Sequence, residues 1–443
     1  MNKAQILEIL VDWNLWGNFK PNFKERRKYQ KRIKELLKGK QILVIKGIRR
    51  AGKSALCYLV IEELIKEKKL KKEESLVINF EDPRFPDNLE AKDLVKIYEV
   101  YLEHLRPSKN QIVVLDEIQR VKGWEKFARF LKENKKVNVI VTGSSSKLLS
   151  EEYATVLAGR HLDLEVFPLS FKEFLEFKNL KIKSKLELVK NKIKIKRFFE
   201  EYLRFGGFPE IVLIEKKEEL LREYFKDIVT KDVVKRFKIR EIGKIEDLAR
   251  FYLTNIGNLI SFNKIKNYFK ISLDSAERFS KYLETARICF FMPKFSFSLT
   301  SQILSPKKVY SIDSGLSNAI SFKFSENLGR VLENLTFLEL QREKEISPEN
   351  EIFYYKIENT GKEIDFLLKQ GKKIKALFQV CANLEDFFTK EREIKSLILG
   401  AEKLKCQDLI IFTQDFEGKE KIKNHIIKFI PLWKWLIEKD EKS

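Results

Sequence analysis

The sequence predicts an α/β protein whose first part is a doubly wound parallel sheet, and three observations predict it. Short apolar runs suited to buried strands alternate with amphipathic helical stretches over residues 1–165. The first strand-like run, QILVI, leads into the glycine-rich stretch KGIRRAGKSAL, and a later one, IVVL, ends in two acids. The second half changes to helices and then to strands joined by polar turns, which is an α+β pattern.

The totals predict a soluble chain with more than one core. Its 443 residues are enough for about three domains. No uninterrupted apolar run reaches the ~18 residues of a membrane span, and the first residues lack the features of a signal peptide. The four cysteines form neither a disulfide framework nor a zinc spacing. We therefore expect a cytoplasmic protein without a membrane role.

The charge is strongly one-sided. The chain has 87 Lys and Arg against 65 Asp and Glu, a net charge of +22. A Lys- and Glu-rich proteome of the heat-adapted kind would explain the charged fraction of 34%, but not its sign. An excess of positive charge favours polyanionic partners, because their condensed counterions are released on binding. The composition thus favours contact with nucleic acid, most simply DNA.

The glycine-rich stretch matches the phosphate-binding pattern G-x-x-x-x-G-K-[ST] between a strand and a helix. The glycines let backbone N–H groups point inward at phosphate oxygens, and the helix that follows begins under the same anion. Lys53 would reach the β- and γ-phosphates, and the Ser54 hydroxyl would ligate Mg²⁺. The sequence therefore predicts a P-loop NTPase that binds ATP and Mg²⁺ through Gly47, Ile48, Ala51, Gly52, Lys53, Ser54 and Ala55.

Two acids follow the strand at 112–115. At the carboxyl end of a strand, about sixty residues after a phosphate loop, they fit a Walker B element. We expect Asp116 to hold Mg²⁺ through water and Glu117 to act as the general base toward the attacking water. With strands at 41–45, 76–80 and in VNVIVT, this makes four strands of one parallel sheet.

Two further positions are candidates for reading the γ-phosphate. The strand VNVIVT ends in a serine run, in which Ser144 or Ser145 could sense the phosphate; the alternative is a turn that caps the next helix. Arg160 follows a glycine and precedes an alternating strand. It could stabilise charge on the transferred phosphoryl group, within its own or a neighbouring subunit, or be an ordinary surface arginine.

Several stretches together resemble one family over nearly the whole chain: GIRRAGKS, VINFEDPRF, VVLDEIQRVKGWEKF, VTGSSSKLL, LAGRHLDLEVFPLSFKEFL and FGGFPEIVL. This is the family of archaeal and bacterial AAA-like P-loop ATPases with an additional C-terminal region. The resemblance implies that Arg49, Arg50 and Arg160 are nucleotide-contact candidates. It also implies an ATPase core at 1–165 with a helical segment at 1–38, a helical lid at 166–225, a winged-helix segment at 226–320 and a restriction-endonuclease-like domain at 321–443.

The order of elements from residue 241 is itself that of a winged helix-turn-helix. A helix with apolar residues at helical spacing precedes a short helix, the tight turn KISLD, a longer helix at 275–285 and two strand-like stretches. The second helix of such a motif would enter a major groove. The alternative is a packing or dimerisation module with solvated lysines. The basic residues available are Lys264, Lys266, Lys270, Arg278, Lys281 and Arg287.

The last region supplies only part of a nuclease site. In the restriction-endonuclease-like fold, a helix glutamate, a strand aspartate and an acid-x-Lys pair surround the metal. Glu333 and Asp365 take the first two places, but Gln379 and Cys381 stand where the acid and the lysine would be. An amide oxygen is a poorer ligand for Mg²⁺ than a carboxylate, and a thiol is no fixed cation. We predict a nuclease-shaped domain without nuclease activity.

Together these features predict an ATP-driven switch that acts on DNA or on a DNA-associated partner. A slow-turnover, ATP-regulated protein-binding module is the alternative, and an ATP-dependent nuclease is disfavoured by Gln379 and Cys381. A homo-oligomer or a protein partner remains open on the sequence.

Overall fold

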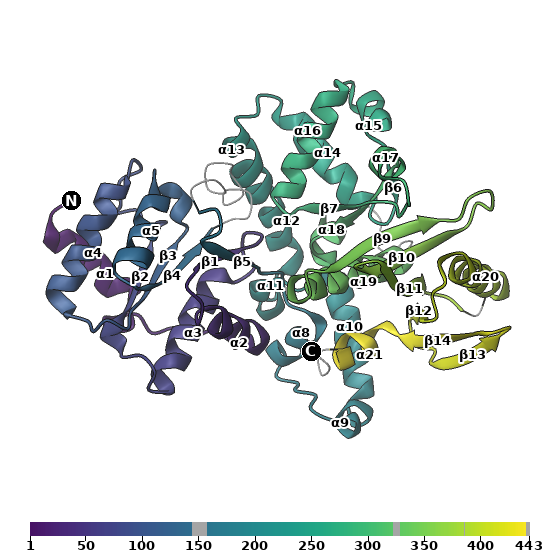
Figure 1. Ribbon diagram of the computed structural model, residues 1–443, viewed down its shortest axis with the longest axis horizontal. Helices are drawn as coiled ribbons and strands as arrows, with labels where there is room; N and C mark the ends of the chain where they lie inside the picture. The colour runs from purple at the N-terminus through teal and green to yellow at the C-terminus, as the bar shows by residue number, and fades with distance from the viewer. Residues whose placement is uncertain (144–156, 322–327, 385, 440–443) are drawn as a thin grey trace. The chain divides into compact units, whose positions relative to one another are not determined.

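A computed structural model of the chain describes residues 1–143, 157–321, 328–384 and 386–439 (Figure 1). The chain divides into two compact units, residues 1–166 and residues 167–443. In the described ranges, no helix is both long and apolar enough to cross a membrane.

The described part of the first unit is built on a five-stranded sheet in the order β2-β3-β4-β1-β5, and all its pairs are parallel. The sequence predicted four of these strands. The fifth exists because the alternating run after Arg160 pairs with β1 along its whole length. The strands are β1 (Ile42–Lys46), β2 (Ser75–Asn79), β3 (Ile112–Asp116), β4 (Asn138–Thr142) and β5 (His161–Glu165).

Helices accompany this sheet because the crossover between two parallel strands is usually a helix. The three central strands are runs of Val, Ile and Leu buried on both faces, as parallel strands usually are. The described helices of the unit are α1 (Lys3–Trp13), α2 (Arg27–Leu36), α3 (Lys53–Lys66), α4 (Ala91–Leu105) and α5 (Trp124–Asn134), with short 3-10 helices η1 (Lys72–Glu74) and η2 (Ile118–Arg120).

The edge strand β2 is closed by the chain's first residues. The Asn14 side chain donates to the Val77 carbonyl at 2.9 Å and accepts from the Val77 N–H at 2.7 Å. The Trp16 indole donates to the Ser75 carbonyl at 2.9 Å. These side chains satisfy backbone groups that an open sheet edge would leave for another strand.

The order of the strands decides where a ligand can bind. Because β4 lies between β1 and β3, the segments that follow these three strands meet at one edge of the sheet. In open parallel sheets, ligands bind at the carboxyl ends of the strands, where the connections diverge.

The second unit begins with a helical part. A turn between two of its helices is held by a buried carboxylate: the Gly207 N–H donates to Asp313 Oδ2 at 2.7 Å, and a Cβ on Gly206 would lie 1.9 Å from Asp313 Oδ1. Only glycine therefore fits at position 206. The helices up to residue 237 are α8 (Phe171–Phe177), α9 (Lys185–Lys190), α10 (Lys192–Phe205), α11 (Pro209–Leu213), α12 (Lys217–Asp227), the π-helix η3 (Ile228–Val234) and α13 (Lys235–Phe237).

Next comes a compact group of helices on a small antiparallel sheet of order β6-β8-β7. Ser272 caps the start of the helix at Leu273–Thr285 by accepting a hydrogen bond from the Ser275 N–H at 3.0 Å. The elements are α14 (Ile242–Thr254), β6 (Leu259–Ile260), α15 (Phe262–Phe269), α16 (Leu273–Thr285), β7 (Cys289–Met292), α17 (Leu299–Leu304), β8 (Lys307–Ser311) and α18 (Ser314–Ile320).

The chain ends in a six-stranded mixed sheet of order β13-β14-β12-β11-β10-β9. The apolar face that includes Leu377 packs on α20, and on the other face Phe378 stacks on Phe412, which meets Trp435 of α21. The elements are α19 (Leu328–Ile346), β9 (Asn350–Lys356), β10 (Glu363–Gln370), β11 (Lys373–Cys381), α20 (Phe387–Leu404), β12 (Leu409–Thr413), β13 (Gly418–Ile422), β14 (His425–Pro431) and α21 (Leu432–Glu438).

Candidate nucleotide site

The turn from β1 into α3 has the backbone shape of a phosphate loop. Gly47, Arg50 and Gly52 have φ angles of 148°, 70° and 92°. A Cβ on Gly47 would lie 2.2 Å from the carbonyl oxygen of Val166, so only glycine lets the chain leave β1 here. No side chain caps the first turn of α3. Its first N–H groups are therefore available to an anion.

Lys53 lies at the centre of this loop. Its side chain is buried, and Nζ donates to the carbonyl oxygens of Gly47 at 3.1 Å and Ile48 at 3.2 Å. Ile48 and Ala51 are buried beneath the loop, whereas Ser54 and Ala55 in the first turn of α3 are half-buried. The Lys53 ammonium is thus held inside the curve of the loop by two of the loop's own carbonyl groups.

Three strands contribute to one hydrogen-bonded group at the sheet edge. The Ser54 hydroxyl donates to Asp116 Oδ1 at 2.9 Å. The Thr142 hydroxyl donates to the same oxygen and accepts from the Glu117 N–H at 3.2 Å. Because β4 lies between β1 and β3, its last residue, Thr142, bridges the loop and the acids. The oxygens gathered here are hard donors of the kind that Mg²⁺ prefers.

Asp116 is a buried carboxyl group with a perturbed pKa. Burial raises the pKa of Asp116 to about 6, and the neighbouring Glu117 adds to the rise. The hydrogen bonds from Thr142 and Ser54 and the charge of Lys53 lower it in part. A buried carboxylate with an excess of negative charge beside it is stabilised by a bound cation.

Glu117 begins the turn after β3 in the left-handed region, with φ of 54°. A non-glycine residue in this region carries backbone strain, which is often found at functional positions. Its half-buried carboxylate accepts a hydrogen bond from the Gln119 side chain. The contact with Gln119 therefore holds the Glu117 carboxylate at the end of β3, close enough to Asp116 to act on its charge.

The two loop arginines lie at the same edge. Arg49 Nη1 is 3.3 Å from Glu81 Oε1, and Arg120 Nη2 is 3.5 Å from the same oxygen. Arg50 is exposed. The segments after β1, β2 and β3 thus meet around the Glu81 carboxylate, at the carboxyl edge of the sheet.

Arg160 is not brought to this group. Its carbonyl accepts from the Ile42 N–H at the start of β1, and its Nε donates to Glu133 Oε1 at 2.9 Å. Since β5 runs parallel to β1, Arg160 lies at the amino edge of the sheet, about 17 Å of strand away from the level at which the loop begins. In this structure Arg160 therefore lies away from the phosphate loop of its own chain, and a contact with the phosphates of a neighbouring subunit stays a prediction. Ser144 and Ser145 lie outside the described residues.

Sequence reasoning missed three residues that hold this site together. Thr142 is the last residue of β4 and could have been named from its place at the end of an apolar run. Gln119 is two residues after Glu117, but nothing local predicts its bond. Arg26 is almost fully buried, and its Nη1 donates to the Ala51 carbonyl at 2.9 Å, so the N-terminal segment braces the loop.

A second group of acids comes from α19 and β10, and a lysine of β8 lies at its centre. The Lys308 ammonium lies 2.8 Å from Glu333, 2.8 Å from Glu363 and 3.0 Å from Asp365. Burial alone would lower the pKa of Lys308, but Glu333 and the other carboxylates raise it well above its usual value. Among the described residues, no group of three His, Cys, Asp or Glu side chains is arranged to hold a metal ion.

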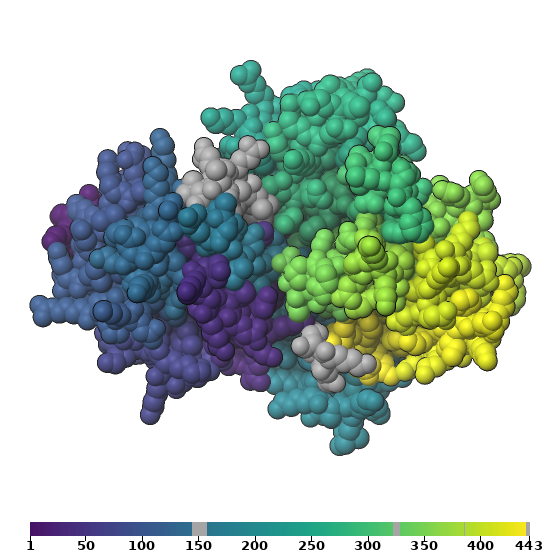
Figure 2. All heavy atoms as spheres, viewed as in Figure 1, coloured from purple at the N-terminus to yellow at the C-terminus, as the bar shows by residue number. Residues whose placement is uncertain are grey.

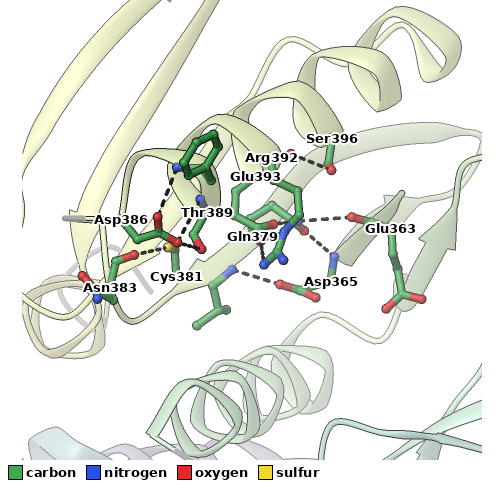
Figure 3. A network of polar contacts seen from close by, with 12 residues as sticks. Glu363, Asp365, Gln379, Cys381, Asn383, Asp386, Thr389, Arg392, Glu393 and Ser396 are labelled. Atoms are coloured by element: carbon green, nitrogen blue, oxygen red, sulfur yellow. Dashed lines mark hydrogen bonds and ion pairs between the residues drawn. The ribbon is translucent and has the colours of Figure 1, made fainter. Parts of the chain in front are cut away.

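The positions predicted to lack nuclease ligands are filled by a polar network (Figure 3). The Gln379 side chain accepts from the Asp365 N–H at 2.6 Å and donates to Glu393 of α20. Asp365 Oδ2 accepts from the Val380 N–H at 3.0 Å, and the Cys381 thiol points to the Asn383 carbonyl at 3.2 Å. Gln379 therefore ties β10 to α20 rather than presenting a free oxygen.

Comparison with known proteins places the first unit in a known domain class. A family model described as an AAA domain matches residues 39–175, and one described as a domain of unknown function (DUF8612) matches residues 196–327. The uncharacterised protein MJ1544 of Methanocaldococcus jannaschii is 39% identical over 409 residues, covering 89% of this chain and 88% of that protein. The chain belongs to this family. An uncharacterised protein of Haemophilus influenzae is 30% identical over 341 residues, covering 75% of this chain and 80% of its own.

Solved structures give a looser likeness. The Walker-type ATPase PABY2304 of Pyrococcus abyssi is 13% identical, with 68% of this chain and 99% of that chain covered and a TM-score of 0.43. AMPPCP-bound DnaA from Aquifex aeolicus is 17% identical, with 62% and 92% covered and a TM-score of 0.23. The AAA-domain match and the parallel sheet make this member of the family an ATP-binding P-loop ATPase.

Proposed function

We propose that this protein hydrolyses ATP with Mg²⁺ and couples the nucleotide state to binding of DNA. One observation carries the enzymatic part: Ser54, from the loop after β1, donates to Asp116, at the end of β3, at 2.9 Å. A phosphate loop and a strand-end acid that share a hydrogen bond can share a cation between them.

The residues present fit both groups. The first N–H groups of α3, which no side chain caps, can meet phosphate oxygens, and Ser54 and Asp116 offer hard oxygen atoms for Mg²⁺, directly or through water. When bound, Mg²⁺ would draw negative charge from the phosphate oxygens. Lys53 would exchange its two carbonyl contacts for phosphate oxygens, which bind an ammonium more strongly.

Glu117 is the proposed general base. It follows Asp116 at the same sheet edge, at a backbone position with a left-handed φ of 54°. Gln119, which donates to Glu117, would hold the carboxylate toward a water molecule. Thr142, bonded to both Asp116 and the Glu117 N–H, would report on phosphates bound between the loop and the acids.

DNA binding is proposed for residues 242–311 as a winged-helix module. The support is the order of α14, β6, α15, α16, β7 and β8, together with exposed lysines on the helix pair. Arg278 pairs with Asp274 at 3.0 Å. Among the described residues, no carboxylate pairs with Lys264, Lys266, Lys270 or Lys281, so these four ammonium groups are free for phosphates.

We further propose that residues 321–443 are shaped like a restriction endonuclease but do not cleave DNA. The support is the Lys308 ammonium, which already compensates the carboxylates of Glu333, Glu363 and Asp365. A divalent cation would have to displace a buried lysine from three carboxylates. Gln379, turned toward Glu393, adds no ligand.

Turnover and DNA affinity measured together test the proposal. We expect Mg²⁺-dependent release of phosphate that duplex DNA changes severalfold, and a DNA affinity that differs between ATP and ADP. Lys264→Glu/Lys266→Glu should weaken DNA binding and flatten its dependence on salt by about one unit of slope for each phosphate that is no longer neutralised. Lys185→Glu/Lys190→Glu on α9 is the matched control. ATP turnover indifferent to DNA would instead favour a slow, ATP-regulated protein-binding module.

A further inference from the structure

An apolar surface stands at the segment between β7 and β8. We call Phe297, Leu299, Ile303 and Leu304 the α17 patch; their exposed fractions are 86%, 69%, 62% and 78%. Single exposed apolar residues are common, but four of this size within eight positions are not. In Figures 1 and 2 this green segment lies at the surface next to the lighter green of β9 and β10.

The segment that carries the patch is held firmly in place. The Phe295 N–H donates to the Tyr354 carbonyl of β9 at 2.7 Å, and the Tyr354 N–H donates to the Pro293 carbonyl at 3.2 Å. The Phe295 ring is buried against Phe353. Ser298 caps α17 by accepting from the Ser301 N–H at 3.3 Å. The apolar side chains are therefore exposed to solvent on a segment that backbone hydrogen bonds fix to β9.

A basic groove borders the patch. A hollow of about 830 Å³ lies between α17 and the turn from β10 to β11. Its walls combine the rings of Phe295, Phe297 and Phe353 with lysines. Among its described lining residues, Glu351 is the one acid, and it is paired with Lys369. The remaining lining lysines are exposed: Lys372, Lys373 and Lys405.

The composition of the segment argues against DNA as the occupant. Residues 295–304 read FSFSLTSQIL and contain no charged residue. A loop that contacts DNA relies on Arg and Lys for phosphates, and one that binds single strands relies on aromatic faces for stacking. Three of the four side chains in the patch are aliphatic and have no π-face. Apolar aliphatic side chains next to lysines instead match a peptide with apolar and acidic faces.

We propose that the α17 patch and its groove bind an acidic amphipathic helix of a partner protein. The apolar face of that helix packs on Leu299, Ile303 and Leu304, with the Phe297 ring beside it. Its carboxylates meet the ammonium groups of Lys372, Lys373 and Lys405 at the rim. The α17 patch lies within residues 242–311, but this surface uses none of the four lysines proposed to contact DNA (Lys264, Lys266, Lys270 and Lys281) and none of the residues assigned to ATP. Its test is therefore separate from that of the proposed function.

The test uses the full chain and a labelled helical peptide of about 18 residues, long enough for five turns. The peptide has Leu at helical i, i+3, i+4 and i+7 spacing and Glu elsewhere. A second peptide has Lys in place of Glu, a third has Ser in place of Leu, and a labelled single-stranded oligothymidylate of similar length is the fourth probe. Affinities come from fluorescence anisotropy at two salt concentrations.

The wild-type chain should bind the Leu/Glu peptide at least about tenfold more tightly than the other two peptides. Ile303→Asp/Leu304→Asp should weaken it by about tenfold or more, and Lys372→Glu/Lys373→Glu should weaken it and remove most of its salt dependence. Leu186→Asp/Val189→Asp, two exposed apolar positions of α9, is the matched control and should bind as the wild type does.

ATP turnover should be the same in all these variants, which separates a failure here from a failure of the ATPase proposal. The proposal is overturned if the wild type does not bind the Leu/Glu peptide, or if Ile303→Asp/Leu304→Asp binds it equally well. It is also overturned if the oligothymidylate binds more tightly and loses affinity through the same substitutions, which would assign the surface to single-stranded nucleic acid.

Discussion

Ser54 Oγ lies 2.9 Å from Asp116 Oδ1, although 62 positions separate the two residues in the sequence. Ser54 is uncharged, so no attraction between opposite charges brings it to Asp116. They meet because β1 and β3 are parallel strands of one sheet with β4 between them, so that the segments after them share an edge. Thr142, at the end of β4, completes the contact.

Replacing Glu117 by Gln should separate ATP binding from hydrolysis. The amide keeps the size of the side chain and its contact with Gln119 but cannot take a proton from water. We expect ATP affinity within about twofold of the wild type and turnover slowed by about 10²- to 10⁴-fold. Phosphate release and nucleotide binding are measured in parallel, with Glu133→Gln at the other edge as control. Unchanged turnover would remove Glu117 as the base.

Arg160→Ala tests the geometry of the sheet. Because Arg160 lies at the amino edge, paired with Glu133, its loss should leave ATP affinity of the isolated chain unchanged. If turnover falls, the effect must come from a neighbouring subunit. Mixing Arg160→Ala with Lys53→Ala chains would then restore part of the activity, because each subunit would supply what the other lacks. A loss of ATP affinity in Arg160→Ala at monomeric concentrations would contradict the placement.

Asp116→Asn should stabilise the nucleotide-free protein at neutral pH. The folded-state pKa of Asp116 is raised from 3.8 to about 6, so its ionised form costs the fold stability. That cost is absent below about pH 4, grows as the pH rises to about 6 and is constant above it. We expect the variant to gain about 1–3 kcal/mol at pH 7 and little at pH 4.

Hydrogen exchange of the β1 to β4 amides in the absence of nucleotide measures this gain within the first unit. Asp87→Asn, at an exposed position of the same unit, is the control. Equal stabilisation at both pH values, or a destabilised variant, would show that ionisation of the buried Asp116 carboxyl group does not cost the fold stability.

Lys308→Met should destabilise the second unit strongly. It leaves Glu333, Glu363 and Asp365 around a buried space without their cation, a loss of about 3–5 kcal/mol by the measure of other buried ion pairs. The loss should be smaller in acid, because burial raises the pKa of Glu333 to about 7 and this carboxyl group takes up a proton at pH 5. Thermal unfolding at pH 5 and 8 checks this, with Lys307→Met as the neighbouring control.

The same cluster predicts that the wild-type chain does not cleave DNA. Digestion of linear, supercoiled and single-stranded DNA with Mg²⁺ or Mn²⁺ should give no products above background. Cleavage that Asp365→Ala abolishes would show that the lysine-filled cluster can still catalyse.

The loop, the acids and the parallel sheet could be predicted from the sequence because they depend on local spacing. Gly47, Gly52 and Lys53 form one contiguous pattern, and Asp116 directly follows a run that can only be a buried strand. The edge at which strands end then places them together. Arg160 was open on the sequence, although its position before a strand, rather than after one, already points to the opposite edge.

The rest depends on contacts between distant segments, for which the sequence has no local sign. Lys308 is one of many lysines, and only the fold brings it to Glu333 and Asp365. The two glycines at 206 and 207 predict only a turn, and the sequence does not show that the Asp313 carboxylate packs against that turn. The fifth strand, β5, was missed as a sheet member because two of its five residues are exposed and its apolar run is short.

Binding of a fluorescent ATP analogue to the wild type, Lys53→Ala and Lys66→Ala tests the central claim most directly. Lys53 is buried at the start of α3, where the loop after β1 ends, and Lys66 is exposed in the last turn of α3. We expect Mg²⁺-dependent binding by the wild type and by Lys66→Ala, and at least a hundredfold loss of affinity in Lys53→Ala. Equal affinity in all three proteins, or no binding by the wild type, would contradict a nucleotide site at residues 47–54.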